Sequence, residues 1–255
     1  MLRTTVALLS LIAVSSHGRP HTRAPSSATV TNVVLVHGAF VDGSSWQSVY
    51  DILTSHGFHV TLVQEPLTSF DDDVVATRRI LDRQDGPCIL VGHSYGGAII
   101  TSAGNHPRVA ALVYIAAHAL DDGETESANG KKFPNSSRPL VSTADGFVFL
   151  DPVNFPDDFA ADVPRARSEF MAHAQIPTAA KVFTVPATSP AWKRKPSWYM
   201  VAGGDKVINP ALERMYAGRA HSHSVEVPNA SHAVYVSHPA DVAAMIEDAA
   251  RHGSP

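Results

Sequence analysis

The sequence predicts an α/β protein with a doubly wound, mostly parallel β-sheet. Short runs of mostly β-branched residues recur along the chain, and amphipathic segments of helical periodicity separate them. Strands that are apolar on both faces and alternate with helices are typical of a parallel sheet covered on both sides. One long stretch without this alternation, residues 119–196, predicts an insertion between two strands.

The expected elements follow one another as strand and helix from residue 30 onward. The first strand, residues 33–36, is Val-Val-Leu-Val, an unbroken apolar run typical of a strand buried on both faces. The other expected strands lie at 60–63, 88–91, 111–115, 198–201 and 225–227, and the expected helices at 46–55, 72–83, 98–105, 211–219 and 240–251. This alternation predicts a parallel sheet with helices on both faces.

The composition excludes several classes of protein. The chain has 255 residues, of which 44% are hydrophobic and 17% charged, so it can bury a sizeable core in one or two domains. With 20 Lys and Arg against 24 Asp and Glu, it lacks the basic surface that nucleic acids require. Cys88 is its single cysteine, which excludes an internal disulfide and a multi-cysteine metal site.

The amino terminus predicts export. Arg3 precedes an apolar run over residues 6–14, which is too short to span a bilayer but fits a signal peptide covering residues 1–16. We expect residues 17–29 to form a flexible leader and residues 30–255 to form the folded domain. We therefore expect a secreted protein without a membrane partner, or a cytoplasmic one if the segment is no signal. Asn135 and Asn229 begin sequons whose use the sequence leaves open.

The insertion is rich in Pro, Asp and Phe and is expected to form a mainly helical lid. Its phenylalanines can line an apolar cavity, although more than half of them are expected simply to pack the lid onto the sheet. These residues are Phe133, Phe147, Phe149, Phe155, Phe159, Phe170 and Phe183.

A nucleophile elbow follows the third expected strand. The sequence Gly-His-Ser-Tyr-Gly at residues 92–96 stands between a buried strand and a helix, the context that gives Gly-x-Ser-x-Gly its meaning. Any Cβ at Gly92 or Gly96 would collide with the neighbouring strand and helix. We therefore expect Ser94 to be a catalytic nucleophile presented at a helix amino terminus.

A serine hydroxyl needs a base that a carboxylate orients, and here the chain order should be Ser, acid, His. Asp205 and His232 follow the last two expected strands, at the carboxyl edge of the sheet where open α/β folds bind ligands. They are the expected acid and base. Asp121 or Asp122, after the fourth strand, is the alternative acid.

The other histidines have less favourable positions. His37 and His93 are expected to orient loops, and His118 and His173 belong to the lid region. Four others, His221, His223, His238 and His252, are expected at the surface. No His-x-x-x-His or His-Glu-x-x-His pair occurs, so no metal site is expected.

An oxyanion hole is expected from two backbone N–H groups. A small residue after His37-Gly38 lets the N–H of Ala39 point into the site, opposite the elbow. The N–H of Tyr95, directly after the nucleophile, is the second donor.

These motifs resemble the α/β-hydrolase superfamily over nearly the whole chain, from Val33 to Arg251. Residues 34–40, 45–46, 91–97 and 229–239 are similar to small bacterial and fungal hydrolases related to the plant methylesterase and hydroxynitrile-lyase group. The resemblance implies cofactor-free hydrolysis of small esters by Ser94, Asp205 and His232. The lyases carry threonine where Gly38 stands and lysine where Ala233 stands, which counts against cyanohydrin cleavage.

The leading functional prediction is a serine carboxylesterase for small, mostly apolar esters or lactones, with a small-molecule substrate, no cofactor and no metal. Two alternatives stay open, because a fold does not fix a chemistry. One is a tailoring enzyme of secondary metabolism that uses the same triad for thioester hydrolysis, cyclisation or a lyase step. The other is a ligand receptor derived from a hydrolase. The sequence leaves the oligomeric state open.

Overall fold

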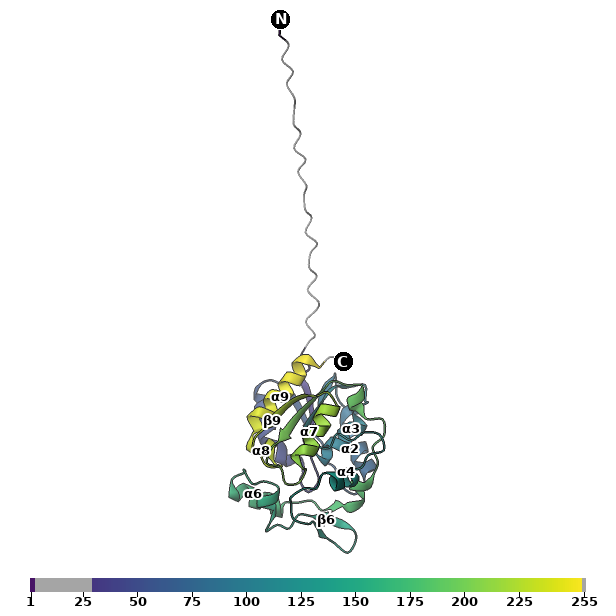
Figure 1. The fold of residues 1–255 in the computed structure, drawn as a ribbon, viewed down its shortest axis with the longest axis vertical. Helices are drawn as coiled ribbons and strands as arrows, with labels where there is room; N and C mark the ends of the chain where they lie inside the picture. Colours follow the sequence, from purple (N-terminus) through teal and green to yellow (C-terminus); the bar gives the residue numbers. More distant parts are fainter. Residues whose placement is uncertain (3–28, 254–255) are drawn as a thin grey trace.

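A six-stranded parallel sheet forms the centre of the protein (Figure 1). Its strand order is β2-β1-β3-β4-β8-β9, so the doubly wound prediction is confirmed. The strands are β1 (Asn32–Val36), β2 (His59–Leu62), β3 (Cys88–Ser94), β4 (Val109–Ala117), β8 (Ser197–Ala202) and β9 (His223–Val227). The direction of winding reverses at β1, and ligands bind open sheets of this kind at such a switch point.

The structure is a computed structural model that describes residues 1–2 and 29–253. The expected signal peptide, residues 1–16, and the leader, residues 17–29, therefore lie almost entirely outside the described residues. Within the described residues, no helix combines the length and the apolar character that crossing a membrane requires.

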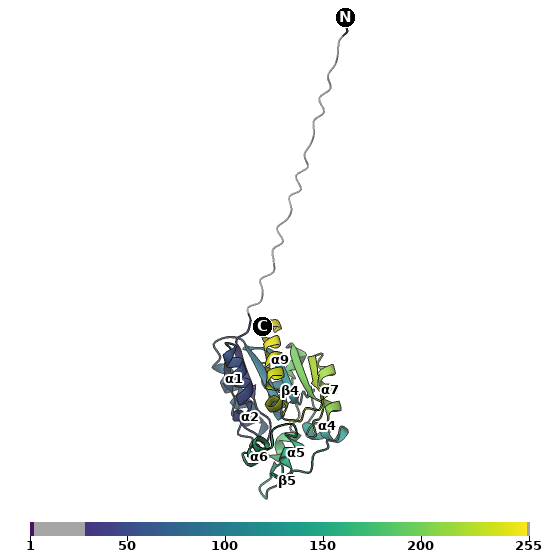
Figure 2. The ribbon, with the colours of Figure 1, turned by 90° about the vertical axis from the view of Figure 1, so that its left-hand side faces the viewer.

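Helices cover both faces of the sheet (Figure 2). On one face α1 (Gln47–Ser55) packs against α9 (Pro239–His252). The short α8 (Val234–Ser237) contacts both of these helices. On the other face α2 (Phe70–Asp82) packs against α3 (Tyr95–Ala103), and α7 (Pro210–Arg219) lies along β8. All of these helices except α8, which was not expected from the sequence, begin near their predicted positions.

Local sequence signals explain the starts of two helices. The Ser69 hydroxyl accepts a hydrogen bond from the Asp72 N–H and caps α2, whose first turn is acidic. Asn209 caps α7 in the same way, and Pro210 occupies the first helical position, where its missing N–H costs nothing.

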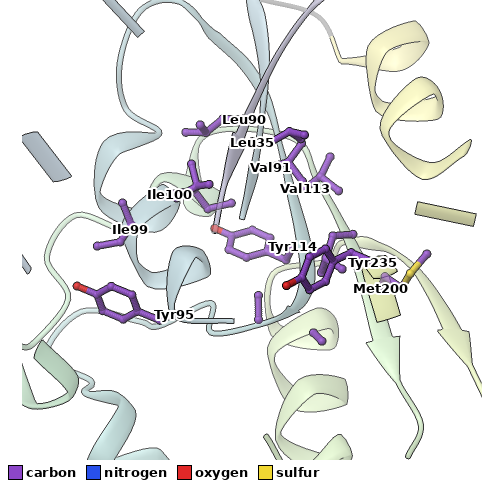
Figure 3. Close-up of a cluster of buried hydrophobic side chains, with 14 of the residues drawn as sticks. Leu35, Leu90, Val91, Tyr95, Ile99, Ile100, Val113, Tyr114, Met200 and Tyr235 are labelled. Atoms are coloured by element: carbon purple, nitrogen blue, oxygen red, sulfur yellow. The ribbon is translucent and has the colours of Figure 1, made fainter. Parts of the chain in front are cut away.

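The core lies between the sheet and its helices, and its side chains come from every central strand (Figure 3). Leu35 of β1, Val91 of β3 and Val113 of β4 are fully buried. The rings of Tyr114 and Tyr199 stack with their centroids 5.8 Å apart. The central strands are thus buried on both faces, as their unbroken apolar runs predicted, whereas the edge strand β9 is largely exposed.

The insertion lies at one end of the molecule, opposite the end at which α9 and the chain terminate (Figures 1 and 2). It contains α4 (Glu126–Lys132), α5 (Phe155–Asp158) and α6 (Arg165–His173). It also contains a small antiparallel sheet of β5 (Val141–Ser142), β6 (Phe147–Phe149) and β7 (Thr178–Ala179), and the 3₁₀ turns Ala180–Thr184 and Ala191–Lys193. The expectation of a mainly helical segment did not include this sheet, because strands of two or three residues are too short to show a period.

Truncating a side chain in the core should destabilise the protein measurably. Val91→Ala removes two buried carbons from a side chain with 0% exposure, and should lower the free energy of unfolding by about 2 to 3 kcal/mol. Val75→Ala on α2, where 49% of the valine is exposed, is the matched control and should cost less than about 0.5 kcal/mol. Urea unfolding of both variants measures the difference. Equal losses would contradict the burial of β3.

Candidate active site

Ser94 lies at the turn between β3 and α3, in a backbone conformation that residues other than glycine rarely adopt. Its φ of 54° and ψ of −123° lie outside the usual regions, as a nucleophile elbow requires. Ser94 also occupies the N-cap position of α3, yet its side chain makes no capping hydrogen bond. The hydroxyl is therefore not used to satisfy the helix, although serine usually serves that purpose there.

The two elbow glycines are required by close backbone contacts. A Cβ on Gly92 would lie 2.5 Å from the carbonyl oxygen of Gly96. A Cβ on Gly96 would overlap the carbonyl oxygen of His37, at the end of β1. The expected reason for both glycines is therefore confirmed, and the contact also brings the turn after β3 against the loop after β1.

Asp205 and His232 meet at the carboxyl edge of the sheet. Oδ2 of Asp205 lies 2.5 Å from Nδ1 of His232, and both side chains are fully buried. Oδ1 of Asp205 accepts hydrogen bonds from the N–H groups of Val207 and Ile208, at 2.6 and 2.9 Å. These two bonds fix the carboxylate, so that its other oxygen holds the imidazole.

Nε2 of His232 makes no hydrogen bond within the described residues. The structure thus joins the predicted acid to the predicted base and leaves the other ring nitrogen free, without a bond to Ser94. A long or absent bond between base and nucleophile is common when no substrate is bound.

His93 and Phe159 hold His232 in place. Nε2 of His93 lies 2.9 Å from the carbonyl oxygen of His232, so His93 donates a hydrogen bond that ties the elbow to the loop of the base. Burial lowers the pKa of His93 well below its usual range, so this ring is neutral. Phe159, from the insertion, packs edge-on against the His232 ring at 4.7 Å between centroids. His93 therefore orients a loop, as expected.

The alternative acids lie elsewhere. Lys193 makes ion pairs with Asp121 and Asp122, and the N–H of Ser189 donates to Asp122. These contacts hold both carboxylates at the surface of the insertion. The structure places Asp205, and neither of these residues, against His232.

His37 fixes the peptide that carries the Ala39 N–H. The N–H of Glu65 donates to Nε2 of His37 at 3.0 Å, which assigns the ring proton to Nδ1. Nδ1 in turn donates to the carbonyl oxygen of Gly38 at 2.9 Å. Because the Gly38 carbonyl and the Ala39 N–H belong to one planar peptide, this bond sets the direction of the expected oxyanion donor. A Cβ on Gly38 would come within 2.7 Å of the Ser94 Cβ, so the loop lies against the nucleophile.

A buried acidic cluster behind this loop was not expected from the sequence. The Tyr95 hydroxyl donates to Asp73 at 2.7 Å, and Asp73 also accepts from the N–H of Leu67 at 2.9 Å. Burial raises the pKa of Asp73 to about 6. Burial and the nearby Asp73 raise the pKa of Glu65 well above its usual range. The sequence signal was available, because Glu65 closely follows β2 at the carboxyl edge of the sheet.

Glu213 is a second residue that sequence reasoning missed. It is fully buried on α7, and one of its carboxyl oxygens accepts from the N–H of Ala202 at 3.0 Å. Burial and the charge of Asp205 raise the pKa of Glu213 well above its usual range. Glu213 is therefore neutral and adds no second negative charge beside Asp205.

A cavity of about 390 Å³ opens at Ser94. Its lining includes Ala39 and Phe40 from the first loop and several residues of the insertion. Of the seven phenylalanines considered for an apolar cavity, Phe183 lines it. Phe155 and Phe159 are fully buried in packing contacts, and Phe170 is 60% exposed. The expectation that most of them pack rather than line the cavity therefore agrees with the structure.

No group of three or more His, Cys, Asp or Glu side chains within the described residues is arranged to hold a metal ion.

Residues 33–245 match the alpha/beta hydrolase family. The chain belongs to this family. The central sheet and the strained turn at Ser94 are those expected from the sequence.

Known proteins similar to this hydrolase include a pyrethroid hydrolase of Sphingobium wenxiniae, which is 30% identical over 252 residues. That alignment covers 86% of this chain and 88% of the relative. The crystal structure of a pyrethroid hydrolase from Sphingobium faniae superposes with a TM-score of 0.72 at 26% identity, and covers 88% of this chain and 98% of that one. A methylesterase from Arabidopsis shares the fold, with a TM-score of 0.70 at 19% identity and coverage of 86% and 98%.

The buried Glu65 should make stability depend on pH. Its pKa is raised on folding, so the stability that its protonated form contributes is complete below about pH 4.5 and falls as the pH rises toward the raised value. Glu65→Met removes this group, and should unfold at a higher temperature than the wild type at pH 8 while the gain shrinks toward pH 4.5. Melting curves across this range measure the effect. Glu169→Met on the exposed side of α6 is the control, and an equal shift there would contradict the assignment.

Proposed function

We propose that this hydrolase is a serine esterase in which Ser94 is the nucleophile, His232 the general base and Asp205 the acid that orients it. One observation carries the proposal: Asp205 holds Nδ1 of His232 at 2.5 Å while Nε2 makes no hydrogen bond within the described residues. The hydroxyl of Ser94, which makes no capping hydrogen bond to α3, is the nucleophile that this base would activate.

The reaction proceeds in two halves. Nε2 of His232 accepts the Ser94 proton as Oγ attacks the ester carbonyl, and returns it to the alcohol oxygen as the carbon–oxygen bond breaks. An acyl group then remains on Ser94. Water attacks this acyl-enzyme with the same help from His232, which releases the acid and restores the serine. Asp205 stays ionised throughout and stabilises the imidazolium.

The tetrahedral intermediates place a negative charge on the former carbonyl oxygen. We assign its stabilisation to the N–H groups of Ala39 and Tyr95. Tyr95 is the first residue of α3, where a backbone N–H has no partner within the helix, and His37 directs the Ala39 peptide. One such donor is worth about 10²- to 10³-fold in rate.

The substrate is a small carboxylic ester or lactone that is mostly apolar. A cavity of about 390 Å³ with Phe40, Leu150, Phe183, Val207 and Ile208 in its lining supports a small acyl or alcohol group. The similarity to a protein named as a pyrethroid hydrolase supports hydrolysis as the reaction.

The experiment that tests the proposal combines labelling with turnover. A fluorophosphonate should modify the wild type on Ser94, and a panel of small p-nitrophenyl and methyl esters should be hydrolysed. Ser94→Ala should abolish labelling and reduce kcat by about 10⁴-fold or more, because the nucleophile is lost. Mass spectrometry locates the adduct. Labelling or ester turnover that persists in Ser94→Ala would reject the mechanism.

Loss of the His37 side chain should impair catalysis without blocking substrate binding. His37→Phe removes the bond to the Gly38 carbonyl, so the Ala39 N–H loses its direction, and kcat should fall by up to about 10²-fold while KM changes little. Steady-state kinetics measure both constants. His56→Phe, at a half-exposed histidine on the far end of α1, is the control. A rise in KM at unchanged kcat would place His37 in substrate binding instead.

A further inference from the structure

A pair of polar side chains lies beside Ser94 that the proposed chemistry does not use. His118 follows β4, and its backbone N–H donates to the carbonyl oxygen of Ser94 at 3.1 Å. Glu126 begins α4 in the insertion. Both residues line the cavity that Ser94 lines, although they are largely buried, with 9% and 8% exposure.

Contacts behind the pair hold His118 in place. The side-chain amide of Asn129 donates to the Tyr216 hydroxyl at 3.0 Å. That hydroxyl lies 3.3 Å from Nδ1 of His118. On the other side of the ring, Nε2 of His118 lies 3.4 Å from one oxygen, Oε2, of Glu126.

The other carboxyl oxygen of Glu126, Oε1, is buried and has no hydrogen-bond partner within the described residues. Burial raises the pKa of Glu126 to about 8, and burial lowers the pKa of His118 to about 3, with His232 nearby adding to that effect. The pair is consequently neutral at pH 7. Glu126 therefore presents an uncharged carboxylic acid, which can donate a hydrogen bond, in the wall of the cavity.

Other ionisable groups near this wall already have partners. Arg219 pairs with Glu124, and Arg138 pairs with Asp158. The hydroxyls of Tyr95 and Tyr216 are held by Asp73 and Asn129, and Lys181, on the 3₁₀ turn packed against α4, is exposed. The carboxyl of Glu126, which lines the cavity, is thus left without a charged partner among the described residues of this wall.

We propose that Glu126, positioned by His118, selects esters that carry a second, neutral oxygen function, such as a hydroxyl or ketone, close to the scissile carbonyl. This inference rests on the proposed ester hydrolysis at Ser94 and narrows its substrate class. The carboxyl of Glu126 donates a hydrogen bond to that oxygen. A hydrocarbon group at the same place leaves a buried donor unpaired, and sites built to bond a substrate oxygen discriminate strongly against analogues that lack it.

Matched esters test the preference directly. Ethyl 3-hydroxybutanoate is compared with ethyl 3-methylbutanoate, and ethyl 4-oxopentanoate with ethyl 4-methylpentanoate, so each pair exchanges an oxygen function for a methyl group of similar size. In at least one pair the wild type should favour the oxygenated ester by about tenfold or more in kcat/KM. Glu126→Leu should bring that ratio close to one, and Glu126→Gln, whose amide also donates, should keep most of it. Glu169→Leu on exposed α6 is the matched control and should keep the full ratio.

The pH dependence gives a second readout that needs no apolar variant. The wild-type preference should fall as the pH rises through about 8, since ionised Glu126 accepts but no longer donates. In Glu126→Gln the ratio should stay level over the same range. If Glu126→Leu fails to fold, this comparison decides the question.

Binding separates failure of the inference from failure of the proposed esterase. The Ser94→Ala protein is titrated with both pairs by calorimetry, where the oxygenated ester should bind more tightly. If the wild type hydrolyses no ester, the proposed function fails. The ratio of the two binding affinities still tests whether Glu126 recognises the second oxygen function. Ratios near one in both turnover and binding, or ratios that Glu126→Leu leaves unchanged, would overturn the assignment even if Ser94 proves to be the nucleophile.

Discussion

The close approach of two backbone segments, the turn after β3 and the loop after β1, is the constraint on which the site depends. Gly96 can sit against the His37 carbonyl, and Gly38 against Ser94, because neither has a side chain. This contact occurs where the winding of the sheet reverses, between β1 and β3. It brings Ser94, whose hydroxyl makes no capping hydrogen bond, close to the Gly38–Ala39 peptide that His37 orients. A methyl group at either glycine would separate them.

Around this contact the protein buries several ionisable groups and keeps them neutral. Desolvation shifts the pKa values of Glu65, Glu126 and Glu213 upward and that of His93 downward. Neutral buried groups act as fixed hydrogen-bond donors and acceptors without adding uncompensated charge. As a result these groups add no further charge around Asp205 and His232, and the neighbouring polar groups orient peptides and rings. Buried polar networks stabilise a structure when each member has a hydrogen-bond partner, and an unpaired member is costly. The Oε1 atom of Glu126 is such an unpaired member among the described residues.

The insertion contributes to both the catalytic groups and the cavity. Phe159 packs on the His232 ring, and its carbonyl accepts from the N–H of Ala233, so the segment around α5 braces the loop of the base. Thr178 accepts a hydrogen bond from the N–H of Phe40 and so holds the loop after β1. Helix α4 adds Glu126 to the cavity wall. One continuous segment thus supports the loop of the proposed base and supplies part of the cavity wall.

The sequence by itself determined the sheet, the elbow at Ser94 and the positions of Asp205 and His232, because each depends on local signals. Apolar runs mark buried strands, glycines mark the tight turn, and parallel strands deliver the residues that follow them to one edge. Only the tertiary structure decided which phenylalanines pack and which line the cavity. It also joined Glu65 to His37, which lie 28 residues apart in the chain, and placed Glu126 against His118. The position of Glu126 and the packing of the phenylalanines depend on how the insertion folds over the sheet, and its short strands and turns carry no periodic signal from which that arrangement could be inferred.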